Sequence, residues 1–208
     1  MKRLRIAITK GRLLKDAIAL FERAGLNCDA LREDTRRLVL PLTDYPLDVV
    51  LAKAPDVLTY VTSGVCEIGI VGKDTIMEHG GSFYEMLDLR FGACRFALAV
   101  REGDDFFGTY KNRRVASKYP NVTRRWFAGQ GMDVETIKIE GSVELAPILG
   151  LADAIMDVVQ TGTTLRENGL TPIETIAHIS ARLIVNTAGM KLYKPQVEDL
   201  LNRLEAVI

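Results

Sequence analysis

The order of apolar and polar positions predicts strands and helices that alternate from the start of the chain. Leu4 to Ile8 alternate as a half-buried strand does, and the apolar residues from Leu13 to Phe21 repeat with helical spacing. Gly25 ends this helical pattern. Further strands are expected at 38–40, 47–52 and 67–71, and a helix at 57–63. This alternation favours an α/β lobe with a largely parallel sheet.

A second series of elements begins near Phe91. The pattern predicts strands at 96–100, 114–117, 134–139 and 153–159, and helices at 121–128 and 143–150. Residues 173–185 are mostly apolar and long enough to return the chain to the first lobe, before an amphipathic helix at 197–204. We therefore expect a discontinuous α/β domain of residues 1–91 plus 181–208 and an inserted α/β domain of residues 92–180. Ligand sites are usual in the cleft between such lobes.

Composition excludes several classes of protein. The 208 residues are 48% hydrophobic, and 27 Lys and Arg balance 27 Asp and Glu, so no basic field favours nucleic acid. No segment is long enough to span a membrane. The apolar run Leu4 to Ile8 is too short for a signal peptide, so we expect a cytoplasmic protein. The cysteines Cys28, Cys66 and Cys94 show no zinc or disulfide spacing and are expected to be buried thiols.

The most informative stretch runs from Asp153 to Leu165. It predicts a buried strand, a turn at which Gly162 takes a positive φ, and a short helix that Gly169 ends. Backbone N–H groups and the hydroxyls of Thr161, Thr163 and Thr164 would then converge at a helix N-terminus, where the helix dipole favours an anion. Asp157 adds a carboxylate suited to a sugar diol or Mg²⁺, which indicates a ribose phosphate. The alternative is a hydroxyl-rich turn that only caps the helix.

Other nucleotide motifs are absent. The chain contains neither G-x-G-x-x-G nor G-x-x-x-x-G-K-[ST], so dinucleotide and P-loop chemistry are disfavoured. His79 and His178 have no spacing that suggests a triad or a metal cluster, so general base catalysis by histidine is not expected.

Cations follow two of the expected strands. Lys10-Gly11-Arg12 comes after the first strand, at the end where α/β sheets bind ligands, although it could be a solvated helix start. Lys53 follows strand 47–52 and can reach an anion, although a surface ion pair with Asp56 is an equal alternative. Arg36 lies in the preceding connection.

Two further turns resemble strand-to-helix connections. Gly72 would permit close backbone approach, Lys73 follows it, and Asp74 is a natural N-cap. Glu144 lies in the first turn of an expected helix, where it would complement the helix dipole.

Together these segments resemble the ATP phosphoribosyltransferase family over nearly the whole chain, in its short form. The most specific match is E-L-A-P-x-x-G-L-A-D-x-I-x-D-V-V-x-T-G-x-T-L, from Glu144 to Leu165. The other matching segments are Thr9 to Leu13, Asp34 to Leu38, Leu51 to Val57 and Gly69 to Asp74.

The resemblance implies a two-lobed fold like the type II periplasmic binding proteins, with the active site in the interlobe cleft. It implies transfer of the 5-phosphoribosyl group of 5-phosphoribosyl-1-diphosphate to N1 of ATP, the first step of histidine biosynthesis. Mg²⁺ would be bound with the diphosphate substrates and not in a protein cage. A separate regulatory subunit similar to histidyl-tRNA synthetase would join catalytic dimers in a hetero-octamer.

The resemblance also implies roles for residues. Thr161, Gly162, Thr163 and Thr164 would hold the 5-phosphate, and Asp157 the ribose hydroxyls. Arg36 and Lys53 would be catalytic, and with Lys10 and Arg12 would hold the diphosphate or the ATP phosphates. The remaining expected substrate-binding residues are Gly11, Gly72, Lys73, Asp74, Lys118, Tyr119, Glu144 and Asp153.

Two alternatives remain open. Base-salvage phosphoribosyltransferases carry paired acids before their T-G-x-T turn, whereas Ile155 and Met156 precede Asp157 here. A non-catalytic small-anion binding protein or effector domain could share the two-lobed pattern. Turnover with ATP and the ribosyl donor separates it from an enzyme.

Overall fold

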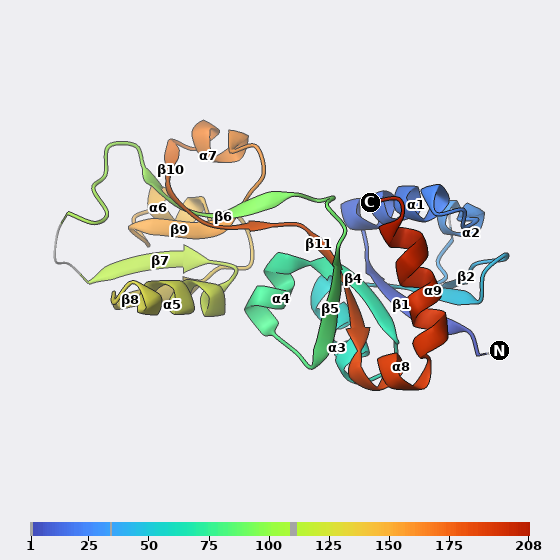
Figure 1. Ribbon diagram of the computed structural model, residues 1–208. Helices are drawn as coiled ribbons and strands as arrows, with labels where there is room; N and C mark the ends of the chain where they lie inside the picture. Colours follow the sequence, from blue (N-terminus) through green and yellow to red (C-terminus); the bar gives the residue numbers. More distant parts are fainter. Residues whose placement is uncertain (1, 34, 109–111) are drawn as a thin grey trace. The chain divides into compact units, whose positions relative to one another are not determined.

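The computed structural model describes residues 2–33, 35–108 and 112–208, which form two compact units (Figure 1). Unit 1 comprises Met1–Gly92 and Ser180–Ile208, and unit 2 comprises Ala93–Ile179. Both units are α/β, because each places helices on a sheet.

Unit 1 is built on a six-stranded sheet of order β2-β3-β1-β4-β11-β5. Its strands are β1 (Leu4–Thr9), β2 (Val39–Pro41), β3 (Leu47–Ala52), β4 (Ile68–Gly72), β5 (Phe83–Asp88) and β11 (Ala181–Asn186). Its helices are α1 (Arg12–Arg23), α2 (Asp29–Arg32), α3 (Ala54–Thr62), α4 (Lys73–His79), α8 (Thr187–Leu192) and α9 (Lys194–Glu205).

The sheet of unit 1 is mixed, which corrects the expectation of a largely parallel one. Strands β3, β1 and β4 are parallel, whereas β2, β11 and β5 run antiparallel to their neighbours. The short connection between β2 and β3 permits only an antiparallel pair, because a parallel pair needs a crossover of a dozen residues or more.

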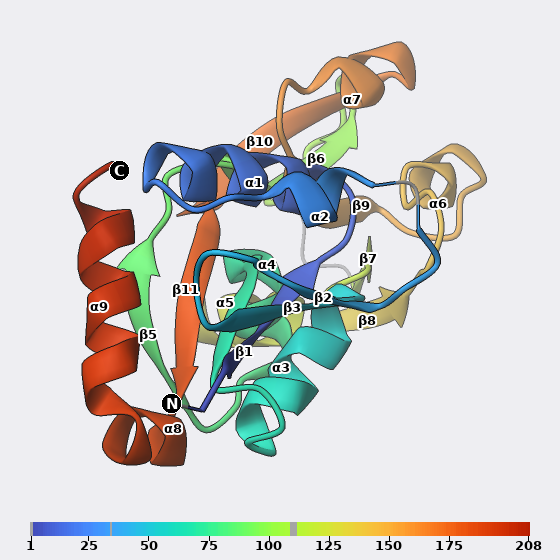
Figure 2. The same cartoon turned by 90° about the vertical axis from the view of Figure 1, so that its right-hand side faces the viewer.

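Helices cover both faces of this sheet (Figure 2). On one face, Ile6 and Ile8 of β1 pack in a cluster with Phe21 of α1 and Leu200 of α9. On the other face, Ala7 packs with residues of α3. Burial on both faces explains why residues 6–8 of β1 and the whole of β4 are apolar.

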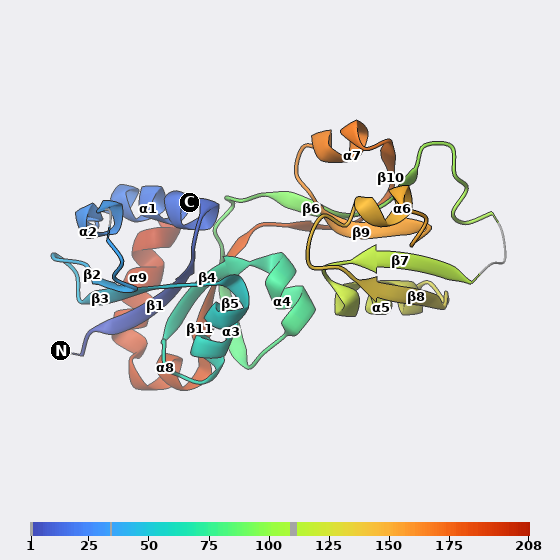
Figure 3. The same ribbon diagram turned by 180° about the vertical axis from the view of Figure 1, so that it is seen from behind.

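Unit 2 has a five-stranded sheet of order β10-β6-β9-β7-β8. Its strands are β6 (Cys94–Arg101), β7 (Arg113–Ser117), β8 (Val134–Lys138), β9 (Ala154–Val159) and β10 (Leu170–Ile179). Its helices are α5 (Pro120–Gly129), α6 (Leu145–Ile148) and α7 (Thr163–Glu167). Figure 3 shows α6 and α7 on one side of β9 and α5 on the other. Leu165 of α7 and Ala146 of α6 pack on Ile155 and Val159 of β9.

Two expected elements differ in the structure. The helix expected at 143–150 is only α6, because Pro147 has no N–H to donate to the carbonyl of residue 143 and Gly150, with φ 73°, ends the helix. The long strand expected at 173–185 is two strands, β10 and β11, which belong to different sheets and are separated at Ser180. There the Ser180 hydroxyl donates to the Asp88 carboxylate at 2.6 Å.

The expectation of buried thiols is confirmed for two of the three cysteines. Burial raises the pKa of Cys28 and of Cys66 to about 11, so both stay protonated at neutral pH. Cys94 is only partly buried, and all three are free thiols. Within the described residues, no helix is both long and apolar enough to cross a membrane.

Candidate functional site

One edge of the unit 2 sheet gathers most of the residues expected to bind the ribosyl donor. Strands β8, β7 and β9 are parallel, so their carboxyl ends meet at the same edge, where α/β sheets usually bind ligands. Lys118 and Tyr119 follow β7 at this edge, and Glu144 lies in the connection after β8. The Thr161–Thr164 loop follows β9.

The expected strand, turn and short helix around this loop are confirmed. Gly162 has φ 74° and ψ 7°, a left-handed conformation that residues with a Cβ adopt at a cost, and it is the N-cap of α7. The N-cap Gly162 has no side chain to cap α7, but the Thr161 hydroxyl accepts the Thr163 N–H at 3.4 Å, so the alternative of a hydroxyl-rich turn that caps the helix stays open. The side chains of Thr161, Thr163 and Thr164 are exposed, so their hydroxyls are accessible to a ligand.

Arg166 of α7 is hydrogen-bonded to the loop at two positions. Its guanidinium donates to the Thr161 carbonyl at 3.2 Å and to Thr163 Oγ1 at 3.1 Å. Thr161 Oγ1 and Thr163 Oγ1 lie 3.1 Å apart, so the two hydroxyls are close enough to contact one small anion. The loop therefore combines two hydroxyls, a helix start and a guanidinium in a single turn.

A cavity of about 440 Å³ opens beside this loop. Its lining residues are Arg95, Glu102, Thr161, Gly162, Arg166, Gly169, Leu170, Thr171 and Pro172. Sequence reasoning did not single out Arg95 and Arg166, which line this cavity. The available signal for Arg95 was an arginine near the start of a strand whose interior, Phe96 to Val100, is apolar.

The two aspartates of this segment lie at different ends of β9. Asp157 is near its carboxyl end, partly buried, and its carboxylate accepts the Val158 N–H at 2.8 Å. Asp153 precedes β9, roughly 20 Å of strand from the loop, so the structure does not bring it to this edge. Its carboxylate accepts the Arg114 N–H at 2.8 Å, a bond that ties it to the amino end of β7.

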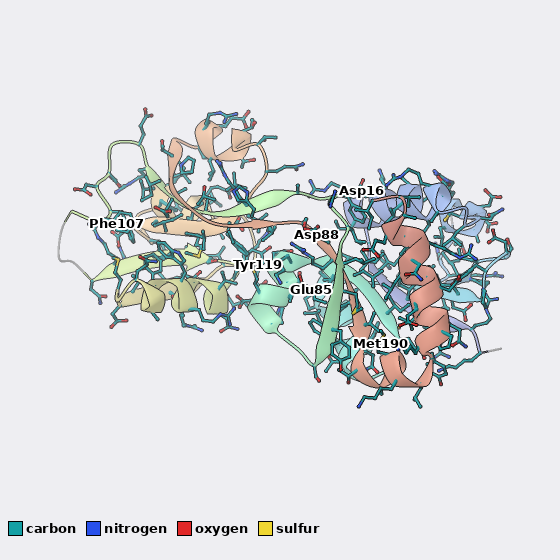
Figure 4. All side chains as sticks on the ribbon, viewed as in Figure 1. Asp16, Glu85, Asp88, Phe107, Tyr119 and Met190 are labelled. Carbon is teal, nitrogen blue, oxygen red and sulfur yellow. The ribbon has the colours of Figure 1, made fainter. Side chains whose placement is uncertain are left out.

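Tyr119 and Glu144 are held by local structure. The Tyr119 ring, labelled in Figure 4, packs edge-on against Phe96 with centroids 4.9 Å apart, and its N–H donates to the Ser117 hydroxyl at 2.9 Å. Glu144 is the N-cap of α6 and not a residue of its first turn, which corrects the expected position.

The corresponding edge of the unit 1 sheet gathers cations. Lys10 and Lys53 follow the parallel strands β1 and β3, and the Lys10 N–H donates to the Ala52 carbonyl at 3.0 Å. The connection that carries Arg36 leads into β2 at the same edge, since the Leu51 N–H donates to the Leu38 carbonyl at 2.9 Å. Asp34, in the same family segment, lies outside the described residues.

These unit 1 cations have no acidic partner in the part of the chain that the structure describes. No ion pair there involves Lys10, Arg36 or Lys53, so the alternative pair between Lys53 and Asp56 does not form. All three side chains are exposed. They are therefore available to bind an anion.

The Lys10-Gly11-Arg12 turn requires its glycine. Gly11 has φ 91° and ψ −134°, a region that essentially only glycine occupies, and it is the N-cap of α1. This conformation turns the chain sharply from β1 into the helix that Arg12 begins.

The Gly72-Lys73-Asp74 turn differs from expectation in two ways. Gly72 and not Asp74 is the N-cap of α4, and Asp74 lies in the first turn. A Cβ on Gly72 would meet only the Asp74 carboxylate, which can move aside, and Gly72 has an ordinary φ of −68°, so its backbone conformation does not require glycine. Lys73 Nζ pairs with Glu85 at 2.5 Å, and Glu85 and Asp88 of β5 also pair with Arg182 (Figure 4). Lys73 is therefore less suited to bind an anion than Lys10 or Lys53.

No group of three or more His, Cys, Asp or Glu side chains is placed to hold a metal ion in the described residues. His79 and His178 are exposed and lie in separate units.

Comparisons with known proteins agree on one family. The family model HisG, ATP phosphoribosyltransferase, matches residues 53–206. The ATP phosphoribosyltransferase of Clostridium kluyveri is 52% identical over 100% of this chain and 94% of its own length. The one from Listeria monocytogenes serotype 4b is 53% identical over 100% of this chain and 97% of its own length.

Solved structures share the fold. The ATP phosphoribosyl transferase (HisG:HisZ) complex from Thermotoga maritima matches with a TM-score of 0.84 and 31% identity, over 98% of both chains. The periplasmic aliphatic sulphonate binding protein SsuA from Escherichia coli matches with a TM-score of 0.61 over 100% of this chain and 72% of its own. At 13% identity the second match shows the fold alone, and it confirms the expected likeness to periplasmic binding proteins.

Proposed function

The chain belongs to the ATP phosphoribosyltransferase family, and from that premise we propose how its residues divide the work of the reaction. The enzyme transfers the 5-phosphoribosyl group of 5-phosphoribosyl-1-diphosphate to N1 of ATP and releases diphosphate, the first step of histidine biosynthesis. The observation that carries this conclusion is the full-length match to the curated relatives. A non-catalytic binding protein of the same fold is not favoured.

Unit 2 binds the ribosyl donor. The N–H groups and hydroxyls of the Thr161–Thr164 loop hold the 5-phosphate, which the exposed threonine side chains and the start of α7 support. Asp157 accepts hydrogen bonds from the ribose hydroxyls. Lys118, Tyr119 and Glu144 lie at the same sheet edge and contact the substrates around this loop.

Unit 1 supplies the positive charge. The diphosphate or the ATP phosphates are held by four cations, Lys10, Arg12, Arg36 and Lys53. Gly11 makes the sharp turn between Lys10 and Arg12. The turn of Gly72, Lys73 and Asp74 also contacts the substrates. Its contribution to binding is smaller, because Lys73 already pairs with Glu85. Asp153 has the least support, because its carboxylate is bonded at the far end of β9.

The chemistry requires alignment and charge neutralisation more than proton transfer. Adenine N1 has a free lone pair, so it attacks the anomeric carbon without a general base. The ribose passes through an oxocarbenium-like state as the bond to the diphosphate breaks, as in glycoside chemistry. Arg36 and Lys53 stabilise the charge that develops on the departing diphosphate, while the loop holds the ribose in line with N1. The absence of a catalytic histidine from the proposed site agrees with this mechanism.

Magnesium enters as part of the substrates. We expect Mg²⁺ to arrive bound to diphosphate oxygens, because Mg²⁺ is usually held by substrate phosphates and neutralises their charge. The cations of unit 1 would then bind this complex.

The reaction provides the test. The purified chain, mixed with ATP, the ribosyl donor and Mg²⁺, is expected to produce the ultraviolet change of an N1-substituted adenine. Excess EDTA is expected to abolish this signal, and added Mg²⁺ to restore it. Absence of both product and diphosphate above background, even with the regulatory subunit present, would remove the proposed function.

A second subunit regulates the enzyme. The Thermotoga maritima relative was solved as a HisG:HisZ complex, which supports a partner for this chain. The partner is a histidyl-tRNA-synthetase-like subunit that assembles with catalytic homodimers as a hetero-octamer in the cytoplasm.

We predict that the isolated chain is weakly active and barely inhibited by histidine. Both activity and inhibition should rise when the regulatory subunit is added, because a partner shifts a conformational equilibrium only through differential binding to its states. Initial rates with and without the partner, across a histidine titration, measure both effects. Strong histidine inhibition of the homogeneous isolated chain would contradict the prediction.

A further inference from the structure

The cavity beside the Thr161–Thr164 loop contains an arginine that the roles described above do not use. We propose that Arg95 is an additional ligand of the 5-phosphate, and that it makes the enzyme specific for a phosphorylated ribose. This inference rests on the proposed function, because it adds a residue to the donor site of that reaction.

The strand pairing places Arg95 next to the loop. Strand β6 runs antiparallel to β9, and Arg95 lies opposite Val159, the last residue of β9. Directly opposed residues have Cβ atoms about 4.5–5.5 Å apart, so Arg95 begins within one strand spacing of the chain that turns into Thr161. A Cβ on Gly162 would lie 3.8 Å from Val159 Cγ1 and 3.4 Å from Arg166 Nη1, so the loop folds back over this strand end.

The alternation of β6 puts the Arg95 side chain on the correct face of the sheet. Ala97 and Ala99 share its face, and both pack in the cluster that contains Val159 and Leu165 of α7. Figure 3 shows α7 on this side of the strands. The side chain therefore extends beneath the helix whose N-terminus is the proposed phosphate site, and it lines the cavity there.

The Arg95 side chain lacks partners within the described part of the chain. Its Nε atom is buried and has no hydrogen-bond partner there. A buried N–H group without an acceptor is costly, and native structures leave few of them. Neither Arg95 nor Arg166 forms an ion pair with a described residue. A bound anion would supply the missing acceptor.

The lining groups favour a phosphate monoester. The cavity is lined by two guanidinium groups, the Thr161 hydroxyl and one carboxylate, that of the exposed Glu102. Positive charge is therefore in excess among the lining residues. A guanidinium fork matches phosphate oxygens in pairs, and an arginine bond is more directional than a lysine bond. Arg166 is already bonded to the loop, so Arg95 is the guanidinium that remains to bind the phosphate.

The experiment uses ribose 5-phosphate, which carries the 5-phosphate and lacks the diphosphate. Calorimetric titration is expected to show that Arg95→Met weakens its binding by about ten- to a hundredfold, the range for a charge-assisted hydrogen bond. Arg95→Lys keeps the charge without the fork and should fall between Arg95→Met and the wild type. Binding of ATP and of inorganic diphosphate should not change in either variant.

A matched control comes from the other end of the same strand. Arg101 is exposed, pairs with Asp104 at 3.0 Å and does not line this cavity. Arg101→Met removes the same charge from β6 and should leave the affinity for ribose 5-phosphate unchanged. Near-ultraviolet circular dichroism checks that each variant is folded. If Arg95→Met does not fold, Arg95→Lys serves as the test variant.

A specificity measurement separates phosphate binding from a structural role. The ratio of kcat/KM for 5-phosphoribosyl-1-diphosphate to that for ribose 1-diphosphate should fall at least tenfold in Arg95→Met. Equal losses with both donors, or unchanged affinity for ribose 5-phosphate, would overturn the role of Arg95. Failure of the wild type to form product would instead count against the proposed function, so the two failures are distinguishable.

Discussion

Replacement of Lys53 by alanine is expected to lower kcat by roughly a hundredfold or more, with a smaller rise in KM. Losses of this size follow when a group that stabilises charge developing in the transition state is removed. Lys53 is exposed, follows β3 directly and has no acidic partner in the described segments, so its charge is available to an anion. Steady-state kinetics with both substrates varied gives the two parameters separately.

Two variants accompany this measurement. Arg36→Ala should act in the same direction, because the connection that carries Arg36 reaches the same sheet edge. Lys191→Ala removes an exposed lysine from α8 and should leave kcat unchanged. A rise in KM with unchanged kcat in Lys53→Ala would make Lys53 an anchor of the bound substrates and not a stabiliser of the leaving group. Circular dichroism excludes loss of folding.

The second large effect is expected from Asp157→Asn, which keeps the shape of the side chain and removes its charge. Affinity for the ribosyl donor should weaken by about 1.5–3 kcal/mol, the range for a hydrogen bond that involves a charged group. The asparagine oxygen can still accept the Val158 N–H that Asp157 accepts at 2.8 Å, so the local backbone should persist. Calorimetric titration with the donor measures the loss.

The matched control for this prediction is Asp133→Asn. Asp133 is exposed on the connection between α5 and β8 and has no proposed contact with the donor. Its substitution should not change donor affinity. Unchanged donor affinity and turnover in Asp157→Asn would remove Asp157 from the site.

The local organisation of the site could be predicted because short-range chemistry fixes it. Gly162 between a buried strand and a polar helix predicts a left-handed turn, and the structure has φ 74° there. The Lys10 and Lys53 positions follow from strand ends, which apolar periodicity marks well. The family motif added the roles of these residues, which periodicity alone does not contain.

Features set by tertiary pairing could not be predicted. The run from Ile173 to Val185 is mostly apolar, and only the pairing of β10 with β6 and of β11 with β4 and β5 shows that the strand breaks at Ser180. Strand β5 is largely exposed and mixes charged with apolar residues, so its sequence lacks the period of a buried strand.

Arg95 illustrates the same limit at the level of one side chain. In the sequence it is a charge beside an apolar strand, 66 positions before Thr161. Only the antiparallel register, which sets it opposite Val159, brings it to the loop. Asp153 shows the reverse, because it belongs to the family motif and yet lies at the other end of β9.

The most direct test of the account is a crystal structure of the chain with 5-phosphoribosyl-1-diphosphate and Mg²⁺ bound. The account predicts that the 5-phosphate accepts hydrogen bonds from the Thr161–Thr164 loop and that the Asp157 carboxylate contacts the ribose hydroxyls. A 5-phosphate bound instead at the Lys10-Gly11-Arg12 turn, with the Thr161–Thr164 loop in contact with no part of the donor, would contradict it.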